Sequence, residues 1–262
     1  MMTASGKKTL DRALARTGAC SRSAARAAIV AGRVQVGGRT VRDPDAWIDP
    51  VRDKLSLDGK PVLAQKKSVW MLHKPVGYVT TADDERGRPT VYALLPDGLP
   101  WLAPVGRLDQ DTSGLLLFTN DSDLANLITD PASKLPKTYE VTCRALDEDA
   151  LERLRSGVQL DDGPTKPATV RQQPGDSDGD GDAALLRLVI TEGRNRQVRR
   201  MLTAVGSRVL ALHRTRIGPL ELGELPGGEA RPLDAREVAA LRAALTRSQG
   251  PRRPRTSRDR AR

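Results

Sequence analysis

The sequence predicts an α+β protein, with a small basic α/β module over residues 8–67 and a larger domain over residues 68–246. Three observations support this fold class. The 262 residues are enough for two separate cores. Apolar spacing in the first module changes from helical to alternating, whereas the later residues are mainly strand, turn and long loop. The short polar break at residues 65–67 marks the expected boundary, and we expect the second domain to hold a long, mixed, mostly antiparallel sheet.

The first module is expected to begin with two short helices. Apolar residues recur at helical spacing over residues 10–18, and Gly18 closes the stretch. A second helix should begin after the N-cap Ser21 and end at Gly32. The apolar sides of these helices are formed by Leu10, Ala13, Leu14, Ala25, Ala28 and Ile29.

Short strands are expected to complete the first module. After Gly32, apolar and polar residues alternate around residues 34–41 and 55–57, with turns at 37–38 and 58–59. Arginines are interleaved through the module at positions Arg12, Arg16, Arg22, Arg26, Arg33 and Arg39. The module is therefore expected to be compact and basic.

The second domain is expected to consist mainly of strands. Runs rich in apolar and β-branched residues predict strands at 69–72, 77–80, 114–119, 138–143 and 185–190. Helices are expected at 122–128, 147–156, 197–205 and 235–245. Residues 174–183 are nearly all Asp, Gly and Ser, which is typical of a flexible surface loop.

Charge is strongly and unevenly distributed. The formal net charge is +10 and the isoelectric point is about 10.0, which points to a polyanionic partner. Residues 7–42 contain nine lysines and arginines against Asp11 alone. Residues 247–262 contain seven arginines against Asp259, and we expect this tail to be disordered. The tail either adds diffuse attraction to a polyanion or only keeps the protein in solution.

Several classes of function are disfavoured by the sequence. Cys20 and Cys143 are too few and too widely spaced for a metal site or a disulfide framework, so a reducing, cytoplasmic setting is expected. No apolar run is long enough for a membrane span. His73 and His213 lie far apart in the sequence, with no Cys or carboxylate residue at the spacing of a metal site. The sequence also has no phosphate-binding or dinucleotide-binding loop motif. We therefore expect neither a metal nor a cofactor.

The candidate site lies at Gly106-Arg107-Leu108-Asp109, which continues as Gln110-Asp111-Thr112-Ser113 into the apolar run at 114–119. A loop with two acids, an arginine and small hydroxyls leads directly into a core strand, which is how a reactive group is held on a rigid support. Spacing alone also allows a solvated turn before a buried strand.

This loop resembles the catalytic loop of the pseudouridine synthases, in particular the branch that modifies ribosomal RNA and carries an N-terminal S4 RNA-binding domain. Further blocks agree in order and spacing: KPVGYVT at 74–80, GRPTV at 87–91, KTYEV at 137–141, EGRNRQVRRM at 192–201 and IGPL at 217–220. The first module resembles the S4 domain at Ser21-Arg22 and at residues 31–34. The resemblance covers roughly residues 9–245 and implies a central catalytic cleft.

Residue by residue, the resemblance implies roles for the candidate site. Asp109 matches the catalytic aspartate, Tyr139 the tyrosine that packs against the flipped base, and Leu212 the apolar residue on its other side. Arg107, in the same loop, is expected to help place the RNA. A tyrosine in a strand is more often simply part of the core, so this alternative stays open.

The resemblance also implies a basic partner for Asp109. We align Arg199 with the arginine that pairs with the catalytic aspartate, and Arg196 is the alternative, counted with the substrate-binding residues. An arginine on a helix is otherwise usually a solvated charge.

These residue types suit the isomerisation of uridine. The N-glycosidic bond must break, the base must rotate, and C5 must then join C1′. A carboxylate can act as a nucleophile or as a base, and both roles stay open. The uridine must leave the RNA helix, so an aromatic side chain is needed to replace its lost stacking.

The expected partner is ribosomal RNA, bound through the S4-like module by Arg12, Arg22, Arg26 and Arg33. No obligate protein partner is expected. The Asp-Thr-Ser-Gly-Leu-Leu-Leu form of the loop resembles the B-type large-subunit enzymes more closely than the small-subunit enzyme, and this resemblance implies the large-subunit RNA as the substrate. The alternative from another class is a non-catalytic ribosome-assembly factor that binds RNA through the same module.

Overall fold

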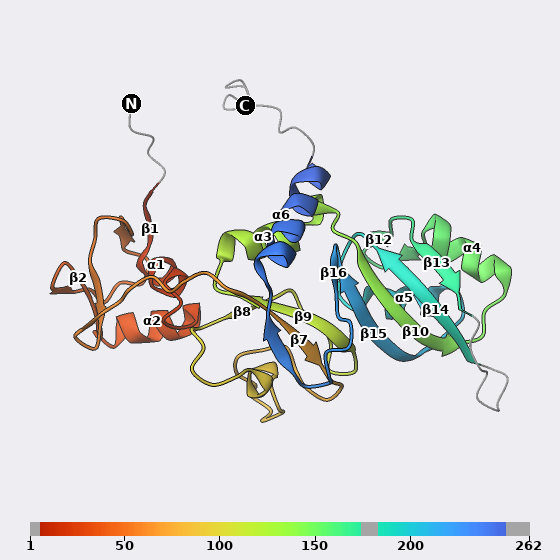
Figure 1. The fold of residues 1–262 in the computed structure, drawn as a ribbon, viewed down its shortest axis with the longest axis horizontal. Helices are drawn as coiled ribbons and strands as arrows, with labels where there is room; N and C mark the ends of the chain where they lie inside the picture. Colours follow the sequence, from red (N-terminus) through yellow and green to blue (C-terminus); the bar gives the residue numbers. More distant parts are fainter. Residues whose placement is uncertain (1–5, 174–182, 250–262) are drawn as a thin grey trace, which may run out of the picture.

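The computed structural model describes residues 6–173 and 183–249. The N-terminal module lies at one end of the molecule, and a large sheet with flanking helices forms the rest (Figure 1). This arrangement confirms the expected α+β fold class. The predicted loop at 174–183, apart from its last residue, and the predicted tail from residue 250 onward lie outside the described residues.

The N-terminal module packs two helices against short strands. Its elements are β1 Lys8–Thr9, α1 Leu10–Arg16, α2 Arg22–Val30, β2 Val34–Val36, β3 Arg39–Thr40, β4 Trp47–Ile48, β5 Leu55–Leu57 and β6 Lys60–Pro61. As expected, Ser21 caps α2 by accepting a hydrogen bond from the Ala24 amide. The strands form a sheet in the order β3-β2-β5-β6 and a separate pair, β1-β4.

The second domain is built on a nine-stranded sheet with the order β13-β14-β10-β15-β9-β7-β17. In addition, β16 pairs with β15 and β8 pairs with β9. The strands are β7 Val69–Lys74, β8 Ala103–Val105, β9 Ser113–Thr119, β10 Lys137–Arg144, β13 Thr169–Gln172, β14 Ala183–Ile190, β15 Val209–Ile217, β16 Leu220–Glu221 and β17 Ala230–Pro232. All pairs are antiparallel except β15 with β9, so the sheet is mixed, as predicted.

Helices cover the two halves of this sheet. They are α3 Ser122–Thr129, α4 Glu148–Ser156, α5 Gln197–Ala204 and α6 Ala235–Gln249, with the 3-10 turns η1 Val91–Leu94 and η2 Pro131–Ser133. One core joins α4 and α5 to β10, β14 and β15, and a second joins α3 and α6 to β7 and β9. A short hairpin of β11 Gln159–Leu160 and β12 Gly163–Pro164 lies beside α5.

Strand β9 is buried on both faces, which explains why its sequence is apolar throughout. Leu115 and Leu117 belong to the core under α3 and α6. Leu116 and Phe118 belong to a further cluster on the opposite face, together with residues around η1. Strands buried on both sides lose the alternation of half-exposed strands. The support for the preceding loop is therefore rigid.

The structure corrects two expectations for secondary structure. Residues 77–80, predicted to form a strand, make only an isolated bridge between Val79 and Thr90. Gly77 has φ +101°, and its amide donates to the carbonyl of Gln110 in the candidate loop, so the segment bends away from the sheet. The last helix continues to Gln249, beyond the expected end at 245.

The N-terminal module is fastened to the second domain by contacts at the end of α1. The Arg16 guanidinium forms two hydrogen bonds with Asp123, at 3.0 and 2.6 Å. The Trp101 amide of the second domain donates to the carbonyl of Gly18. In the described part of the chain, no helix has the length and apolar character needed to cross a membrane.

Candidate functional site

The Asp109 loop connects β8 to β9 and is held by segments distant in the sequence. The Thr80 hydroxyl donates to the Leu108 carbonyl at 2.7 Å, and the Gly77 amide donates to the Gln110 carbonyl at 2.8 Å. The ammonium of Lys74, at the end of β7, donates to the carbonyl of Thr112 at 2.8 Å. The loop conformation is therefore fixed by the KPVGYVT block around it.

A close backbone approach brings this loop to β15. Gly114 pairs in parallel with Arg214, and its φ of +109° lies in the left-handed region. A side chain at Gly114 would collide with the Arg214 backbone. Glycine therefore allows the end of the Asp109 loop to lie against β15, the strand that carries Leu212.

These segments enclose a small cavity of about 70 Å³. Its lining includes Asp109 and Arg107 from the loop, Tyr139 from β10, Leu212 from β15 and Arg196 before α5. The structure thus brings together these five residues predicted from sequence. Tyr139 and Leu212 are each 7% exposed, whereas the side chain of Asp109 is 27% exposed. The carboxylate is therefore accessible in a recess that is lined by apolar side chains and by arginines.

The guanidinium that contacts the Asp109 carboxylate in the structure is that of Arg196, whereas the sequence analysis expected Arg199 as its partner. Arg196 donates to an oxygen of Asp109 at 3.4 Å and forms two bonds with Asp111, at 3.2 and 3.0 Å. Arg199 instead donates to the main-chain carbonyl of Asp111 at 2.8 Å. The reason is local: Arg196 precedes α5 and has φ +46°, so its side chain leaves along a different direction from those on the helix.

Asp111 and Arg196 shift each other's pKa. Burial disfavours the charged form of Asp111, but hydrogen bonds from Arg196 and the charge of Arg199 outweigh it and hold the pKa of Asp111 below its usual value. The bonds to Asp111 raise the pKa of Arg196. Burial lowers the pKa of Arg199. The site therefore holds two carboxylates between two guanidiniums.

Replacing Arg196 by glutamine is expected to lower turnover about tenfold or more, because hydrogen bonds to charged groups contribute about 1.5–3 kcal/mol. Loss of the guanidinium leaves Asp109 and Asp111 without the cation that bridges them. Single-turnover rates on the RNA substrate test this. The exposed Arg236→Gln on α6 makes the same charge change and should be nearly silent. Equal rates for both variants would show that Arg196 does not contribute to turnover.

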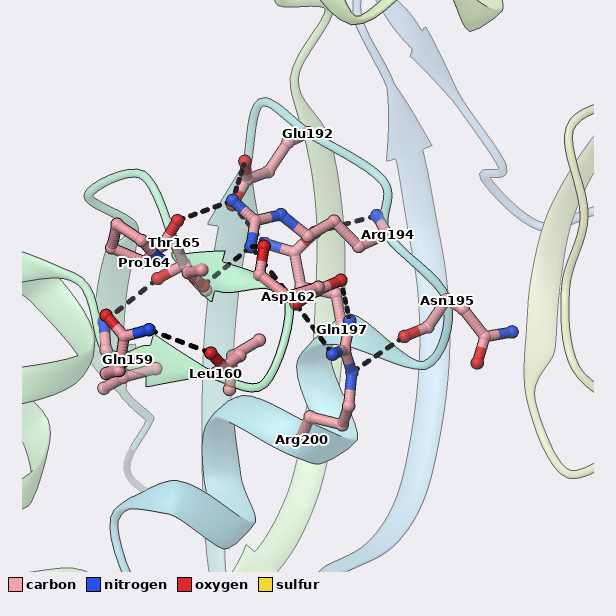
Figure 2. A network of polar contacts seen from close by, with 12 residues as sticks. Gln159, Leu160, Asp162, Pro164, Thr165, Glu192, Arg194, Asn195, Gln197 and Arg200 are labelled. Atoms are coloured by element: carbon pink, nitrogen blue, oxygen red, sulfur yellow. Dashed lines mark hydrogen bonds and ion pairs between the residues drawn. The ribbon is translucent and has the colours of Figure 1, made fainter.

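The conformation before α5 is held by a polar network around Asp162 (Figure 2). Arg200 forms two bonds with the Asp162 carboxylate, at 2.8 and 2.9 Å. Arg194 donates to the carbonyls of Gly163 and Pro164, at 2.8 and 2.5 Å. The hairpin of β11 and β12 thus anchors the residues on either side of Arg196. The sequence did not indicate this anchor, because Asp162 lies far from the recognised blocks.

Lys74 is a second feature that sequence reasoning missed. Its side chain is fully buried, and its ammonium is bound by the carbonyls of Pro75 and Thr112. Burial lowers the pKa of Lys74 to about 8, and the charges of Asp109 and Asp111 only partly oppose this. A buried cation below the Asp109 loop both braces the loop and adds positive potential. Its position in the KPVGYVT block was the available signal.

The stability of the protein should rise with pH through Lys74. Its folded-state pKa of about 8 lies below the usual 10.5, so above pH 8 the folded state holds fewer protons than the unfolded state. Between pH 7 and 9 the unfolding free energy of the wild type should increase by about 1 kcal/mol relative to that of Lys74→Met. Denaturant titrations at pH 7, 8 and 9 measure this. A parallel pH dependence in both proteins would contradict it, and the exposed Lys60→Met should track the wild type.

The arginines predicted to bind RNA in the N-terminal module differ in their partners. The carboxylate of Asp11 is fully buried and binds Arg22 and Arg26 at 2.7 and 3.0 Å. Arg33 is paired with Asp58. Arg12 is exposed and forms no ion pair in the part of the chain that the structure describes. Arg12 thus differs from the other three, which are partly neutralised.

The two histidines lie together on the sheet despite their separation in sequence. Their rings are 5.2 Å apart, edge to face. His73 Nδ1 bonds the Leu225 carbonyl and His213 Nδ1 bonds the Ser113 hydroxyl. Burial and the neighbouring His73 lower the pKa of His213. Within the described ranges, no group of three His, Cys, Asp or Glu residues could hold a metal ion.

Both parts of the chain are similar to known proteins. Residues 68–204 match the family described as RNA pseudouridylate synthase, and residues 8–46 match the S4 domain. An RNA pseudouridine synthase of Aquifex aeolicus is 38% identical over 248 residues, covering 94% of this chain and 98% of its own. The ribosomal large subunit pseudouridine synthase B of Bacillus subtilis is 35% identical and covers 89% and 95%. A crystal structure of a pseudouridylate synthase is 34% identical with a TM-score of 0.64, covering 89% and 99%.

Proposed function

This chain belongs to the RNA pseudouridylate synthase family and carries an S4 domain, and from this premise we propose that it isomerises one uridine of ribosomal RNA with Asp109 as the catalytic carboxylate. The observation that carries the proposal is the accessible carboxylate of Asp109 in a recess between Tyr139 and Leu212. A flipped pyrimidine needs such an arrangement: an apolar slot for its ring and one reactive group at its edge.

In the proposed reaction, the uridine leaves the RNA stack and its ring lies between Tyr139 and Leu212. The carboxylate of Asp109 then acts at the base or the sugar, as nucleophile or as base, while the glycosidic bond breaks. The detached uracil rotates within the slot, C5 bonds to C1′, the proton on C5 is removed, and N1, which has lost its bond to C1′, takes up a proton, so that the product is an isomer of uridine. Packing between Tyr139 and Leu212 keeps the detached base from diffusing away during this rotation.

The arginines support this chemistry in different ways. Arg196 bridges the two carboxylates by donating hydrogen bonds to Asp109 and to Asp111. Arg199 fastens the loop through the Asp111 carbonyl. Arg107 is exposed at the rim of the cavity. There it can contact the RNA backbone or the RNA strand from which the uridine has been flipped. We assign Arg107 to RNA placement and not to bond breaking.

The cavity must widen to admit a base. Its volume of about 70 Å³ is small compared with the roughly 300–1,000 Å³ of typical ligand sites. The side chain of Arg196 is 45% exposed and lies at the edge of the cavity, so it can move without disturbing the core. We therefore expect substrate binding to displace the Arg196 side chain from Asp109.

The proposed substrate is the large-subunit ribosomal RNA. Relatives from Bacillus subtilis, Pseudomonas aeruginosa and Yersinia pestis are named ribosomal large subunit pseudouridine synthase B, at 35%, 39% and 40% identity. Mapping of pseudouridines in ribosomal RNA from cells with and without the gene tests this. We expect one uridine of the large-subunit RNA to lose its modification. Loss confined to small-subunit RNA, or no loss, would contradict the assignment.

A further inference from the structure

A second hollow, of about 660 Å³, lies between the N-terminal module and the synthase domain. It shares no lining residue with the cavity around Asp109. One wall comes from β1, α1, α2 and β4, and the other from β8, the end of β9 and α3. We call this hollow the domain groove.

The domain groove is positively charged. Five of its described lining residues are basic and none is acidic, the five being Lys7, Lys8, Arg12, Arg16 and Arg22. Arg16 and Arg22 are neutralised by Asp123 and Asp11. Lys7, Lys8 and Arg12 form no ion pair within the described residues, so their donors are available to a ligand. The groove therefore favours a polyanion.

An exposed tryptophan lies beside these free cations. Trp47 is 70% exposed, although its backbone is fixed by antiparallel pairing with Thr9. Within the described ranges its ring stacks on no other aromatic ring, whereas Trp101 on the opposite wall is stacked on Tyr92 at 4.7 Å. A large apolar ring left open to solvent on a fixed strand is a ready surface for a flat ligand.

We propose that the domain groove binds an unpaired segment of the RNA substrate, with one base stacked on Trp47 and the adjacent phosphates at Lys7, Lys8 and Arg12. Single-stranded nucleic acids are bound by this combination of an aromatic platform and a basic groove. A fully paired helix hides the faces of its bases, so it cannot use Trp47. The proposal rests on the proposed function for its class of ligand, RNA.

The fastening of the two domains gives this contact a consequence for catalysis. Arg16 is held by Asp123, and Gly18 is held by Trp101, directly beside the groove. RNA bound at Trp47 would therefore be held at a fixed offset from Asp109. The groove then helps to select which uridine reaches the cavity.

Binding to two RNAs tests the platform. The probes are a blunt fluorescein-labelled hairpin and the same hairpin with an oligouridine extension, each titrated with the full-length protein. The wild type should bind the extended hairpin more tightly. Trp47→Ala should weaken binding of the extended hairpin about tenfold and leave the blunt one nearly unchanged. Trp47→Phe should retain most of the affinity, and Leu63→Ala, which removes a side chain that is 75% exposed outside the groove, serves as the control.

The salt dependence of binding tests the charged part of the groove. Arg12→Gln should reduce the slope of log affinity against log salt by about 0.7 for the extended hairpin. Arg33→Gln makes the same change in net charge but removes a guanidinium already held by Asp58, so its slope should change less. Equal slopes for these two variants would overturn the assignment of Arg12 to the groove.

The outcomes separate this proposal from the proposed function. If Trp47→Ala binds both hairpins like the wild type, while the wild type forms pseudouridine, the groove proposal fails and the function stands. If polyglutamate competes with the extended hairpin as well as free oligouridine does, the groove is only a polyanion surface, and the proposal also fails. A wild type that binds no RNA and forms no pseudouridine would instead remove the proposed function itself.

Discussion

Asp109→Asn is expected to abolish pseudouridine formation while leaving the affinity for RNA nearly unchanged. The amide has almost the volume of the carboxylate but is neither a nucleophile nor a base, so turnover should fall about 10³-fold or more. Removing one negative charge from a surface that meets RNA cannot weaken binding electrostatically. The measurements are pseudouridine yield in a single turnover and binding of the same RNA by titration.

The matched control for this variant is Asp97→Asn, which makes the same charge change at an exposed loop position outside the cavity. It should retain wild-type turnover. This pair of variants also separates an enzyme from a non-catalytic RNA-binding assembly factor. A factor of that kind would not depend on the carboxylate of residue 109. Normal ribosome assembly with Asp109→Asn in place of the wild type would therefore support this alternative.

Gly114→Ala is expected to destabilise the protein by more than about 4 kcal/mol, which is exceptional for one methyl group. Its left-handed φ of +109° disfavours any side chain, and a Cβ would collide with the Arg214 backbone, which cannot move without breaking the β9–β15 pairing. Denaturant unfolding measures the loss. The same collision would push the Asp109 loop away from β15, so any folded fraction should be inactive.

Gly98→Ala separates strain from collision. Gly98 also has a positive φ, +77°, but no atom lies within 4 Å of the position of an added Cβ. Alanine there should cost only about 1 kcal/mol, the usual penalty for the left-handed conformation. If both alanine variants were equally stable, the close approach at Gly114 would not constrain the sheet.

The elements predicted from sequence were those whose signals are local. The N-cap at Ser21 and the fully apolar β9 depend on neighbouring residues and were placed within a residue or two. Strand β15 was missed because it carries His213, Arg214 and Arg216 within an otherwise apolar run, and these charges hide its alternation. Its partners β9 and β10 come from distant parts of the chain, and the sequence alone gave no sign of this pairing.

The candidate site was predictable in its members but not in its contacts. Asp109 and Tyr139 were named from motif blocks and Leu212 from the family resemblance, and the three line one cavity. For the partner of Asp109 the sequence analysis offered Arg199, with Arg196 as the alternative, and in the structure the guanidinium of Arg196 makes the contact. Arg196 has a positive φ, and nothing in the sequence predicts this backbone conformation for an arginine.

The ion pairs of the N-terminal module distinguish arginines that look equivalent in the sequence. Sequence composition treated Arg12, Arg22, Arg26 and Arg33 alike, yet three of them are ion-paired. The buried Asp11 is the cause: burial opposes its charge, but Thr9, Arg22 and Arg26 lower its pKa well below the usual range. The position of the single acid Asp11 therefore says more about which arginines are free to bind RNA than the number of arginines does.

The central claim is that Asp109 meets a uridine everted from the RNA. A crystal structure of the Asp109→Asn protein with its RNA substrate tests this most directly. We expect a uracil ring between Tyr139 and Leu212, with residue 109 beside the glycosidic bond and the Arg196 side chain turned away from it. A substrate uridine still stacked within the RNA helix, or a base bound far from residue 109, would contradict it.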